Sequence, residues 1–411
     1  MERTVDEAAM IFTDASAYSH EAHFYATCDF LRRESPVAFV DVKGFKPFWA
    51  LTRYEDVMAV ERAQGLWLNG PRPALAPRPQ DGATQPDIPV RTLVQMDAPD
   101  HTAYRRISID WFKQSSMSRL AARAAELAKR AVDHMAALGG ECDFFADVAV
   151  NYPLYIILAL LGLPEEDFPR MLKLTQEMFG RDDPDMARET QGDALMANLL
   201  EFFEYFEGLI EDRRATPRDD LASAIANAEV AGEPIGVLEA VGYYVIIATA
   251  GHDTTSSAIS GGFAALLSQP DQLRRLMDDP TLVPTAVEEM FRYVSPVKQF
   301  MRTATCEQVL GGVTIPEGGA VLLSFPAANR DDAVFVRPHE FDVAREPNRH
   351  VAFGFGAHYC LGTHLARLET RAFYNEIIPR LDSAELAGEP DFMRTLFVGG
   401  PKSVPVRYRL H

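Results

Sequence analysis

The most restrictive stretch of this sequence lies near its C-terminal end, between Phe353 and Gly362. The strand-like residues 351–353 lead into it, and a helical pattern begins at Leu361. Its glycines let the backbone pass close to a flat, bulky group. Because a helix N-terminus lowers the pKa of a nearby thiol, we predict that Cys360 is a thiolate. A thiolate in such a loop suits an axial ligand of haem iron, whereas the alternative is a buried cysteine that packs as a small hydrophobe.

The composition predicts a globular chain of the cytoplasm. The 411 residues are 47% hydrophobic, which is ample for a large core. The net charge of −19 disfavours nucleic acid and anionic membranes as partners. With no run of about 18 apolar residues and no apolar signal-peptide core at the N-terminus, we expect no membrane span. Four scattered cysteines argue against a disulfide framework or a cysteine-rich zinc site: Cys28, Cys142, Cys306 and Cys360.

Helical periodicity dominates the chain. We predict a single domain over residues 1–411, mainly α-helical, with small β-sheets toward both ends. An antiparallel strand pair is predicted at 38–40 and 48–51, since Gly44 lies between two apolar runs. Residues 69–90 contain six prolines and predict a long irregular loop, either a lid or a solvated excursion. Helices are predicted at residues 21–33, 54–63, 117–138, 189–214 and 284–293.

The longest apolar helical stretch, residues 235–268, is interrupted by a polar run. Before Gly251 the stretch is apolar nearly all round, which predicts a buried central helix. The polar run His252–Ser257 is costly to bury unless its groups have partners or a function, and the glycine favours a local widening of the helix. Asp253 beside Thr254 could relay protons. The alternative is a patch of hydroxyls bonded to carbonyls one turn earlier.

Two further pairs of residues are spaced to share one helical face. His101 and Arg105 are four residues apart, so these two donors could bind one carboxylate or two. The spacing alone favours the alternative, an ordinary solvated helix face. Glu289 and Arg292 are three residues apart and predict an internal ion pair with a structural role.

Together these features resemble the cytochrome P-450 superfamily, the haem-thiolate monooxygenases, over essentially the whole chain. Residues 353–362 match the family's haem-cysteine signature, Phe-x-x-Gly-x-His-x-Cys-x-Gly, which is highly specific. Residues 250–255 match the oxygen-binding groove of its central helix. Glu289 and Arg292 match its Glu-x-x-Arg pair, with Arg345 as the third partner. The resemblance implies the cytochrome P-450 fold, in which a long central helix crosses the haem.

The resemblance also implies a cofactor and a set of site residues. The cofactor is haem b with its iron ligated by Cys360, and Asp253 and Thr254 are the catalytic pair that delivers protons to bound O2. The implied cofactor-binding residues are His101, Arg105, Arg302 and His358, which donate to the haem carboxylates, together with Phe353, Gly354 and Ala250. The implied substrate contacts are Ile246, Thr249, Val297, Phe300 and Val398.

Four segments narrow the resemblance to the terpineol-hydroxylating bacterial subfamily, which implies a small hydrophobic substrate such as a monoterpenoid or an aromatic hydrocarbon. Residues 69–95 and 179–200 are then expected to form a lid. Because the chain has no flavin or iron–sulfur segment, electrons are expected from a [2Fe–2S] ferredoxin with its NAD(P)H-dependent reductase. The four segments are 172–176, 248–257, 300–304 and 397–402, and the arginines proposed to dock the ferredoxin are Arg106, Arg119, Arg367 and Arg371.

Two other functions compete with this interpretation. A haem-binding sensor without turnover would keep Cys360 and the carboxylate donors but would have no use for Asp253 and Thr254. A peroxide-driven relative typically lacks this pair of acid and alcohol. Both residues are present, and we therefore expect a monooxygenase.

Overall fold

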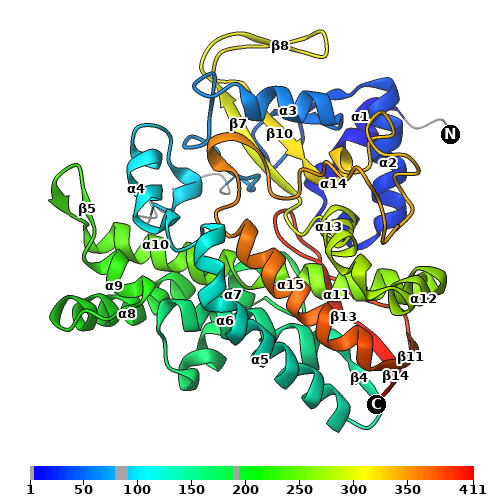
Figure 1. Ribbon diagram of the computed structural model, residues 1–411. Helices are drawn as coiled ribbons and strands as arrows, with labels where there is room; N and C mark the ends of the chain where they lie inside the picture. Colours follow the sequence, from blue (N-terminus) through cyan, green and yellow to red (C-terminus); the bar gives the residue numbers. More distant parts are fainter. Residues whose placement is uncertain (1–3, 79–90, 188–193) are drawn as a thin grey trace.

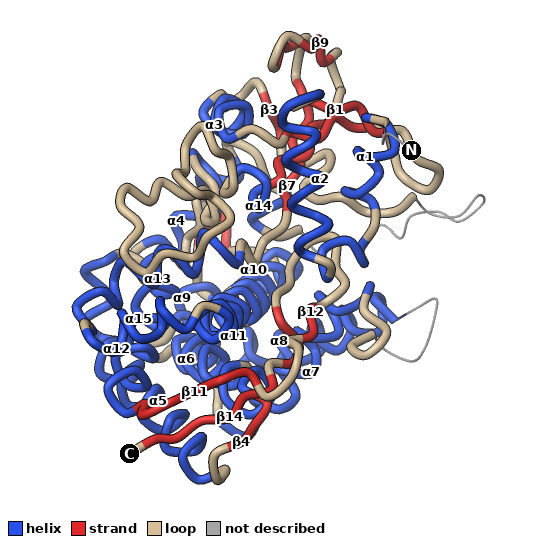
Figure 2. The backbone as a smooth tube through the Cα atoms, turned by 90° about the vertical axis from the view of Figure 1, so that its right-hand side faces the viewer, coloured by secondary structure: helices blue, strands red, loops and turns tan. Residues whose placement is uncertain are grey.

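The computed structural model describes residues 4–78, 91–187 and 194–411. A helix-rich part adjoins a smaller part in which short helices pack around a β-sheet (Figures 1 and 2). This confirms the mainly α-helical architecture that the sequence predicts. The α-helices are α1 Val5–Ala9, α2 Glu21–Glu34, α3 Tyr54–Arg62, α4 Asp100–Ile109, α5 Met117–Ala137, α6 Asn151–Leu161, α7 Phe168–Phe179, α8 Ala194–Ala215, α9 Leu221–Ala226, α10 Val237–Ala250, α11 Asp253–Ser268, α12 Pro270–Asp278, α13 Val283–Val294, α14 Phe325–Ala328 and α15 Thr363–Ile377.

The largest sheet has five strands in the order β1-β2-β10-β7-β3. The predicted antiparallel pair is confirmed, with Ala38 opposite Ala50. A second sheet, in the order β11-β14-β4, joins the C-terminal strands to the helix-rich part (Figure 2). The strands are β1 Val37–Val40, β2 Phe48–Leu51, β3 Trp67–Leu68, β4 Glu141–Asp143, β5 Glu229–Val230, β6 Glu233–Pro234, β7 Gln299–Ala304, β8 Gln308–Leu310, β9 Val313–Ile315, β10 Ala320–Ser324, β11 Leu381–Leu386, β12 Asp391–Phe392, β13 Pro401–Ser403 and β14 Pro405–Leu410.

The central apolar stretch forms two helices rather than one. Helix α10 ends at Ala250, α11 begins at Asp253, and Gly251 and His252 lie between them. A Cβ atom on Gly251 would lie 2.6 Å from a side-chain carbon of Ile157 on α6, so only glycine fits at this crossing. The predicted interruption of the helix is therefore present, and it lies where Ile157 of α6 packs against Gly251.

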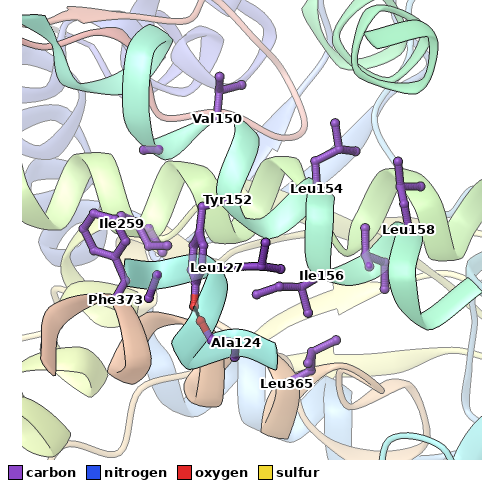
Figure 3. Packing of buried hydrophobic residues seen from close by; sticks show 14 of the residues in the cluster. Ala124, Leu127, Val150, Tyr152, Leu154, Ile156, Leu158, Ile259, Leu365 and Phe373 are labelled. Atoms are coloured by element: carbon purple, nitrogen blue, oxygen red, sulfur yellow. Dashed lines mark hydrogen bonds between the residues drawn. The ribbon is translucent and has the colours of Figure 1, made fainter. Parts of the chain in front are cut away.

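The stretch Phe144–Leu161 forms part of the core. It has the length and mean hydropathy (1.8) of a membrane-spanning helix, although the sequence predicts no span, and 72% of it is buried inside the protein. Figure 3 shows Leu154, Ile156 and Leu158 of α6 among residues of α5, α11 and α15. The hydroxyl of Tyr152 lies 3.0 Å from the backbone carbonyl oxygen of Glu369 on α15 and 3.3 Å from that of Ala124 on α5, so it links α6 to both helices.

The structure differs from the sequence predictions around the cysteine loop. Residues 351–353 do not form a strand, because the amide of Val351 donates to the side chain of Asn329 (2.8 Å) instead of to a neighbouring strand. The helix that follows begins at Thr363 rather than at Leu361. In the two segments predicted as lids, residues 79–90 and 188–193 lie outside the described residues.

Candidate active site

One cavity lies between the central helices and the cysteine loop. Its empty space is about 1350 Å³, part of which is open to solvent. Of the site residues predicted from the sequence, the lining includes His101, Arg105, Ile246, Ala250, Thr254, Val297, Phe300, Arg302, Phe353, Gly354, His358 and Cys360. The structure thus brings together residues from α4, α10, α11, β7 and the cysteine loop.

The cysteine loop is shaped by two glycines. Gly354 and Gly356 have φ angles of +66° and +74°, a region that side chains disfavour. A Cβ atom on Gly356 would lie 2.5 Å from the carbonyl oxygen of Glu61, so the loop depends on glycine where it passes α3. The loop closes on itself through a bond from the amide of Cys360 to the carbonyl of Phe353 (2.9 Å). This closure holds the sulfur at the cavity wall.

The thiol of Cys360 does not have the lowered pKa that the sequence predicts. Burial raises its pKa, although the amide of Gly362 and the charges of Arg105 and Arg367 act to lower it. The nearby helix N-terminus is therefore not sufficient to make a thiolate. A bound metal ion deprotonates a coordinating thiol outright, so the thiolate form depends on a cation at the sulfur.

Four side chains with ring or guanidinium nitrogens line the cavity: His101, Arg105, Arg302 and His358. The rings of His101 and His358 stack at 3.9 Å, and Arg105 donates to the carbonyl of Tyr359 (2.5 Å). Burial, reinforced by the neighbouring cations, lowers the pKa of His101 to about 4 and of His358 to about 2. His101 Nε2 is buried and has no hydrogen-bond partner among the described residues. The cluster therefore offers donors without enough acceptors.

Arg302 differs from the other donors because it already has a carboxylate partner. Its Nη2 atom donates to Glu61 Oε1 (2.7 Å), and both side chains are buried. Glu61 also accepts the amide of Phe355 (3.2 Å). The sequence analysis missed Glu61, because 241 residues separate it from Arg302 and no local pattern links them.

The opposite wall contains the interruption between α10 and α11. The hydroxyl of Thr254 lines the cavity and donates to the carbonyl of Ala250 (2.9 Å). Asp253 is buried beside it but does not line the cavity. Its Oδ1 atom lies 3.2 Å from His252 Nδ1, and its Oδ2 atom has no hydrogen-bond partner in the described part of the chain.

Two of the predicted substrate contacts do not reach the cavity. Thr249 is buried on α10, its hydroxyl donates to the carbonyl of Val245 (2.7 Å), and it does not line the cavity. Val398 pairs with Val297 through a β-bridge and lies behind it. The apolar lining also contains residues that no motif indicated: Leu93, Val94, Phe112, Ile157, Ile247 and Phe325.

Glu369 on α15 is a second cavity residue that the sequence analysis missed. Both of its carboxylate oxygens are buried without a hydrogen-bond partner among the residues described. Burial raises the pKa of this carboxyl well above its usual range. Burial therefore disfavours the charged form of this side chain, which lines the cavity together with Ala366. A lone Glu on an amphipathic helix carries no sequence signal for burial.

The residues of the cavity fit a haem. The unpaired His101 nitrogen and the adjacent guanidinium of Arg105 suit two carboxylate groups. Open space beside Gly354 and Gly362, where a Cβ atom would meet nothing within 4 Å, suits a flat ring. Cys360 provides one soft ligand, and the described residues contain no group of three or more His, Cys, Asp or Glu that could hold a metal ion alone. Such a site suits a metal ion that is already coordinated within a macrocyclic ring, as the iron of haem is.

Comparisons with known proteins agree with this geometry. The family model for cytochrome P450 matches residues 44–404. Cytochrome P450-terp of Pseudomonas sp is 40% identical over 405 residues, 95% of each chain, and linalool 8-monooxygenase of Pseudomonas putida is 31% identical over 385 residues, 92% of this chain and 93% of that protein. The crystal structure of CYP108D1 from Novosphingobium aromaticivorans is similar with a TM-score of 0.90 and 40% identity, and the match covers 99% of each chain.

These matches extend over nearly the whole chain and agree with the fold that the structure shows. They confirm the predicted cytochrome P450 fold and the predicted class of enzyme. The chain therefore belongs to the cytochrome P450 family, the monooxygenases whose haem iron is ligated by a cysteine thiolate.

Proposed function

We propose that this enzyme hydroxylates a small hydrophobic substrate, a monoterpenoid or a small aromatic hydrocarbon, with O2. The observation that carries the proposal is the mostly apolar cavity with Cys360 on one wall and Thr254 on another. The names of two relatives, cytochrome P450-terp and linalool 8-monooxygenase, support a terpenoid substrate. A hydrophobic substrate of this size would be held mainly by apolar contacts, with few polar groups to orient it.

The cofactor would be held by residues from four parts of the chain. We assign Cys360 as the iron ligand and His101, Arg105, Arg302 and His358 as donors to the two haem carboxylates. Arg302 would share its guanidinium between a carboxylate and Glu61, to which it donates in this structure (2.7 Å). The flat faces of the ring would lie against Phe353 and Gly354 on one side and Ala250 on the other.

When bound, the haem supplies the activation of O2 that inserts one oxygen atom into a C–H bond. Asp253 and Thr254 provide protons for this reaction. The Thr254 hydroxyl gives its hydrogen to the Ala250 carbonyl, so its oxygen can accept a hydrogen bond from water in the cavity. Asp253, the residue before Thr254, has an oxygen, Oδ2, that is buried without a partner in the described structure, and we assign to it the transfer of a proton toward that water.

The substrate would contact Ile246 on α10 together with Val297 and Phe300. Phe300 is held by an edge contact with the ring of Phe397 (5.2 Å), and Val398 supports Val297 from behind. Thr249 has no role in this scheme, because its hydroxyl is used within α10. The position of Phe300 and Val297 would therefore determine which small substrates fit.

Electrons would come from a [2Fe–2S] ferredoxin reduced by an NAD(P)H-dependent reductase, which implies the cytoplasm. The four cysteines are free in the structure, as a reducing compartment requires. Of the arginines considered for docking, Arg106 and Arg119 are exposed, whereas Arg367 and Arg371 are paired with Glu288 (2.7 and 3.3 Å). The exposed pair is therefore the better candidate for contact with an acidic partner.

The substrate proposal is tested by a screen of monoterpenoids, small aromatics and longer lipids. Binding in contact with the haem displaces water from the iron, and the expected result is a change from the low-spin to the high-spin spectrum with compact terpenoids or aromatics. Product analysis with a ferredoxin and reductase pair then identifies the hydroxylated carbon. A response restricted to longer lipids would reject the substrate class while leaving the monooxygenase activity intact.

The variant Thr254→Ala tests the proton-delivery role. We expect the yield of hydroxylated product per NAD(P)H consumed to fall by about tenfold or more, with release of hydrogen peroxide in its place. The spectrum and the substrate Kd should remain those of the parent enzyme, because the hydroxyl bonds to the carbonyl of Ala250 at the end of α10 and not to a residue assigned to the haem carboxylates. Unchanged coupling in this variant would remove Thr254 from the mechanism.

A further inference from the structure

We propose that His252 and Asp253 share one proton beside the cavity and that His252 is a positioning residue that supplies this proton through Asp253. The inference rests on the proposed function, since it concerns the same delivery of protons. It assigns a role to His252, a residue that proton delivery by Asp253 and Thr254 alone would not require. Its basis is a set of hydrogen bonds that determines how many protons the pair must hold.

The first nitrogen of His252 must carry a hydrogen. The side chain is fully buried, and its Nε2 atom lies 2.7 Å from the backbone carbonyl oxygen of Val150. A carbonyl oxygen can only accept. Nε2 is therefore the donor, and in a neutral imidazole the other nitrogen, Nδ1, would carry a lone pair.

The second nitrogen faces an oxygen of Asp253 and a hydroxyl whose hydrogen has a closer acceptor. His252 Nδ1 lies 3.2 Å from Asp253 Oδ1 and 3.4 Å from the hydroxyl of Thr175. That hydroxyl gives its one hydrogen to the carbonyl of Leu172 (2.9 Å). Without an added proton, lone pairs on Nδ1 and Oδ1 would face each other in a buried site, which is unfavourable.

The pair is electrically neutral when it holds this proton, which suits its burial. Burial lowers the pKa of His252, but the charge of Asp253, the hydrogen bond to it and the bond to Val150 together raise it above its usual value. Asp253 is also buried. A bare carboxylate at this position would leave an unpaired charge inside the protein.

The route that we propose for this proton leads toward Thr254, the neighbouring residue that lines the cavity, because Asp253 itself does not line it. The proton moves from Nδ1 to Oδ1, and a half-turn of the carboxyl group exchanges the two oxygens, so that the proton faces the side where Oδ2 has no partner. It then passes to a water beside Thr254. The pair is left as neutral imidazole and carboxylate, with one negative charge, until a proton from solvent restores it.

The protonation state can be read without turnover. The probe is the reduced, carbon monoxide-bound holoenzyme labelled with ¹⁵N-histidine and ¹³C-aspartate, and the variants His252→Gln and Asp253→Asn assign the signals. At neutral pH we expect either two N–H groups on the His252 ring or a carboxylic acid at Asp253. An unprotonated Nδ1 together with an ionised Asp253 would overturn the proposal, whatever the activity.

Turnover provides the second readout. In His252→Gln, Asp253 and Thr254 remain in place, so the product formed per NAD(P)H consumed should fall by about tenfold. This loss is smaller than the ~10² to 10⁴-fold rate contribution of a positioned acid. Haem content and substrate Kd should not change, and the solvent isotope effect should rise. Thr175→Val, which removes only the hydroxyl beside Nδ1, is the matched control and should match the parent enzyme. Equal coupling in His252→Gln and this control would reject the role of His252.

The two proposals fail separately. If no substrate is hydroxylated, the proposed function is wrong, and the NMR experiment still reports whether the pair holds its proton. If hydroxylation is normal while Nδ1 and Asp253 are both unprotonated, the proposed function stands and the further inference is wrong.

Discussion

Replacement of Cys360 by serine is expected to reduce hydroxylation below detection while the fold is retained. Serine is smaller and keeps the backbone bond from residue 360 to Phe353, but an alcohol does not donate electron density to iron as a thiolate does. Product formation with a ferredoxin and reductase pair measures the loss. Far-ultraviolet circular dichroism and the ratio of haem to protein separate loss of chemistry from loss of structure or cofactor.

Cys306→Ser is the matched control. Cys306 is exposed in the turn between β7 and β8 and does not line the cavity, so this variant should hydroxylate at the parent rate. If Cys360→Ser retained the activity of this control, Cys360 would not be the iron ligand.

Replacement of Glu289 by glutamine is expected to destabilise the protein by about 3 to 5 kcal/mol. Glu289 is fully buried and accepts two hydrogen bonds from Arg292 (both 2.7 Å). It also accepts from Nε of Arg345 (3.0 Å) and from the amide of Asp342 (2.9 Å). Glutamine removes the negative charge that balances two buried guanidinium groups. Their positive charges would then be buried without a charged partner, which is costly. Urea unfolding of the holoenzyme, followed by circular dichroism and haem absorbance, measures the change.

The exposed pair of Arg337 and Glu340 (2.6 Å) provides the comparison. Glu340→Gln should cost no more than about 1 kcal/mol, since solvent screens this pair. Equal destabilisation by the two substitutions would contradict the structural role of the buried network.

The haem-cysteine loop and most long helices could be predicted because each is encoded locally. The glycines at 354 and 356 adopt the positive φ angles that only glycine adopts easily. Helices such as α5 and α13 follow from a regular apolar period. The Glu289, Arg292 and Arg345 network was also predicted correctly, but there the family resemblance supplied the third partner.

The orientation of single side chains could not be predicted in the same way. Thr249 and Ala250 are adjacent, yet a step of one residue turns a helix by about 100°, and only Ala250 faces the cavity. Val398 was assigned to the wall, but the β-bridge puts Val297 in front of it. Such errors arise because a motif gives the position of a backbone segment, not which of its side chains reach the ligand.

Long-range pairings were likewise beyond the sequence pattern. Arg302 was identified as a donor, but its partner Glu61 lies on α3. The thiolate ligation of haem iron was predicted correctly, but the sequence did not indicate that burial raises the pKa of the Cys360 thiol against the nearby amide and guanidinium groups. Burial depends on the packing of the whole chain, and no local stretch of sequence records it.

The bond between the sulfur of Cys360 and haem iron is tested most directly by the absorbance spectrum of the reduced protein saturated with carbon monoxide. We predict the strongly red-shifted Soret band of a thiolate-ligated haem in the parent enzyme, and its absence in Cys360→Ser. A parent spectrum without that shift, or the same shifted band in the serine variant, would contradict ligation by Cys360.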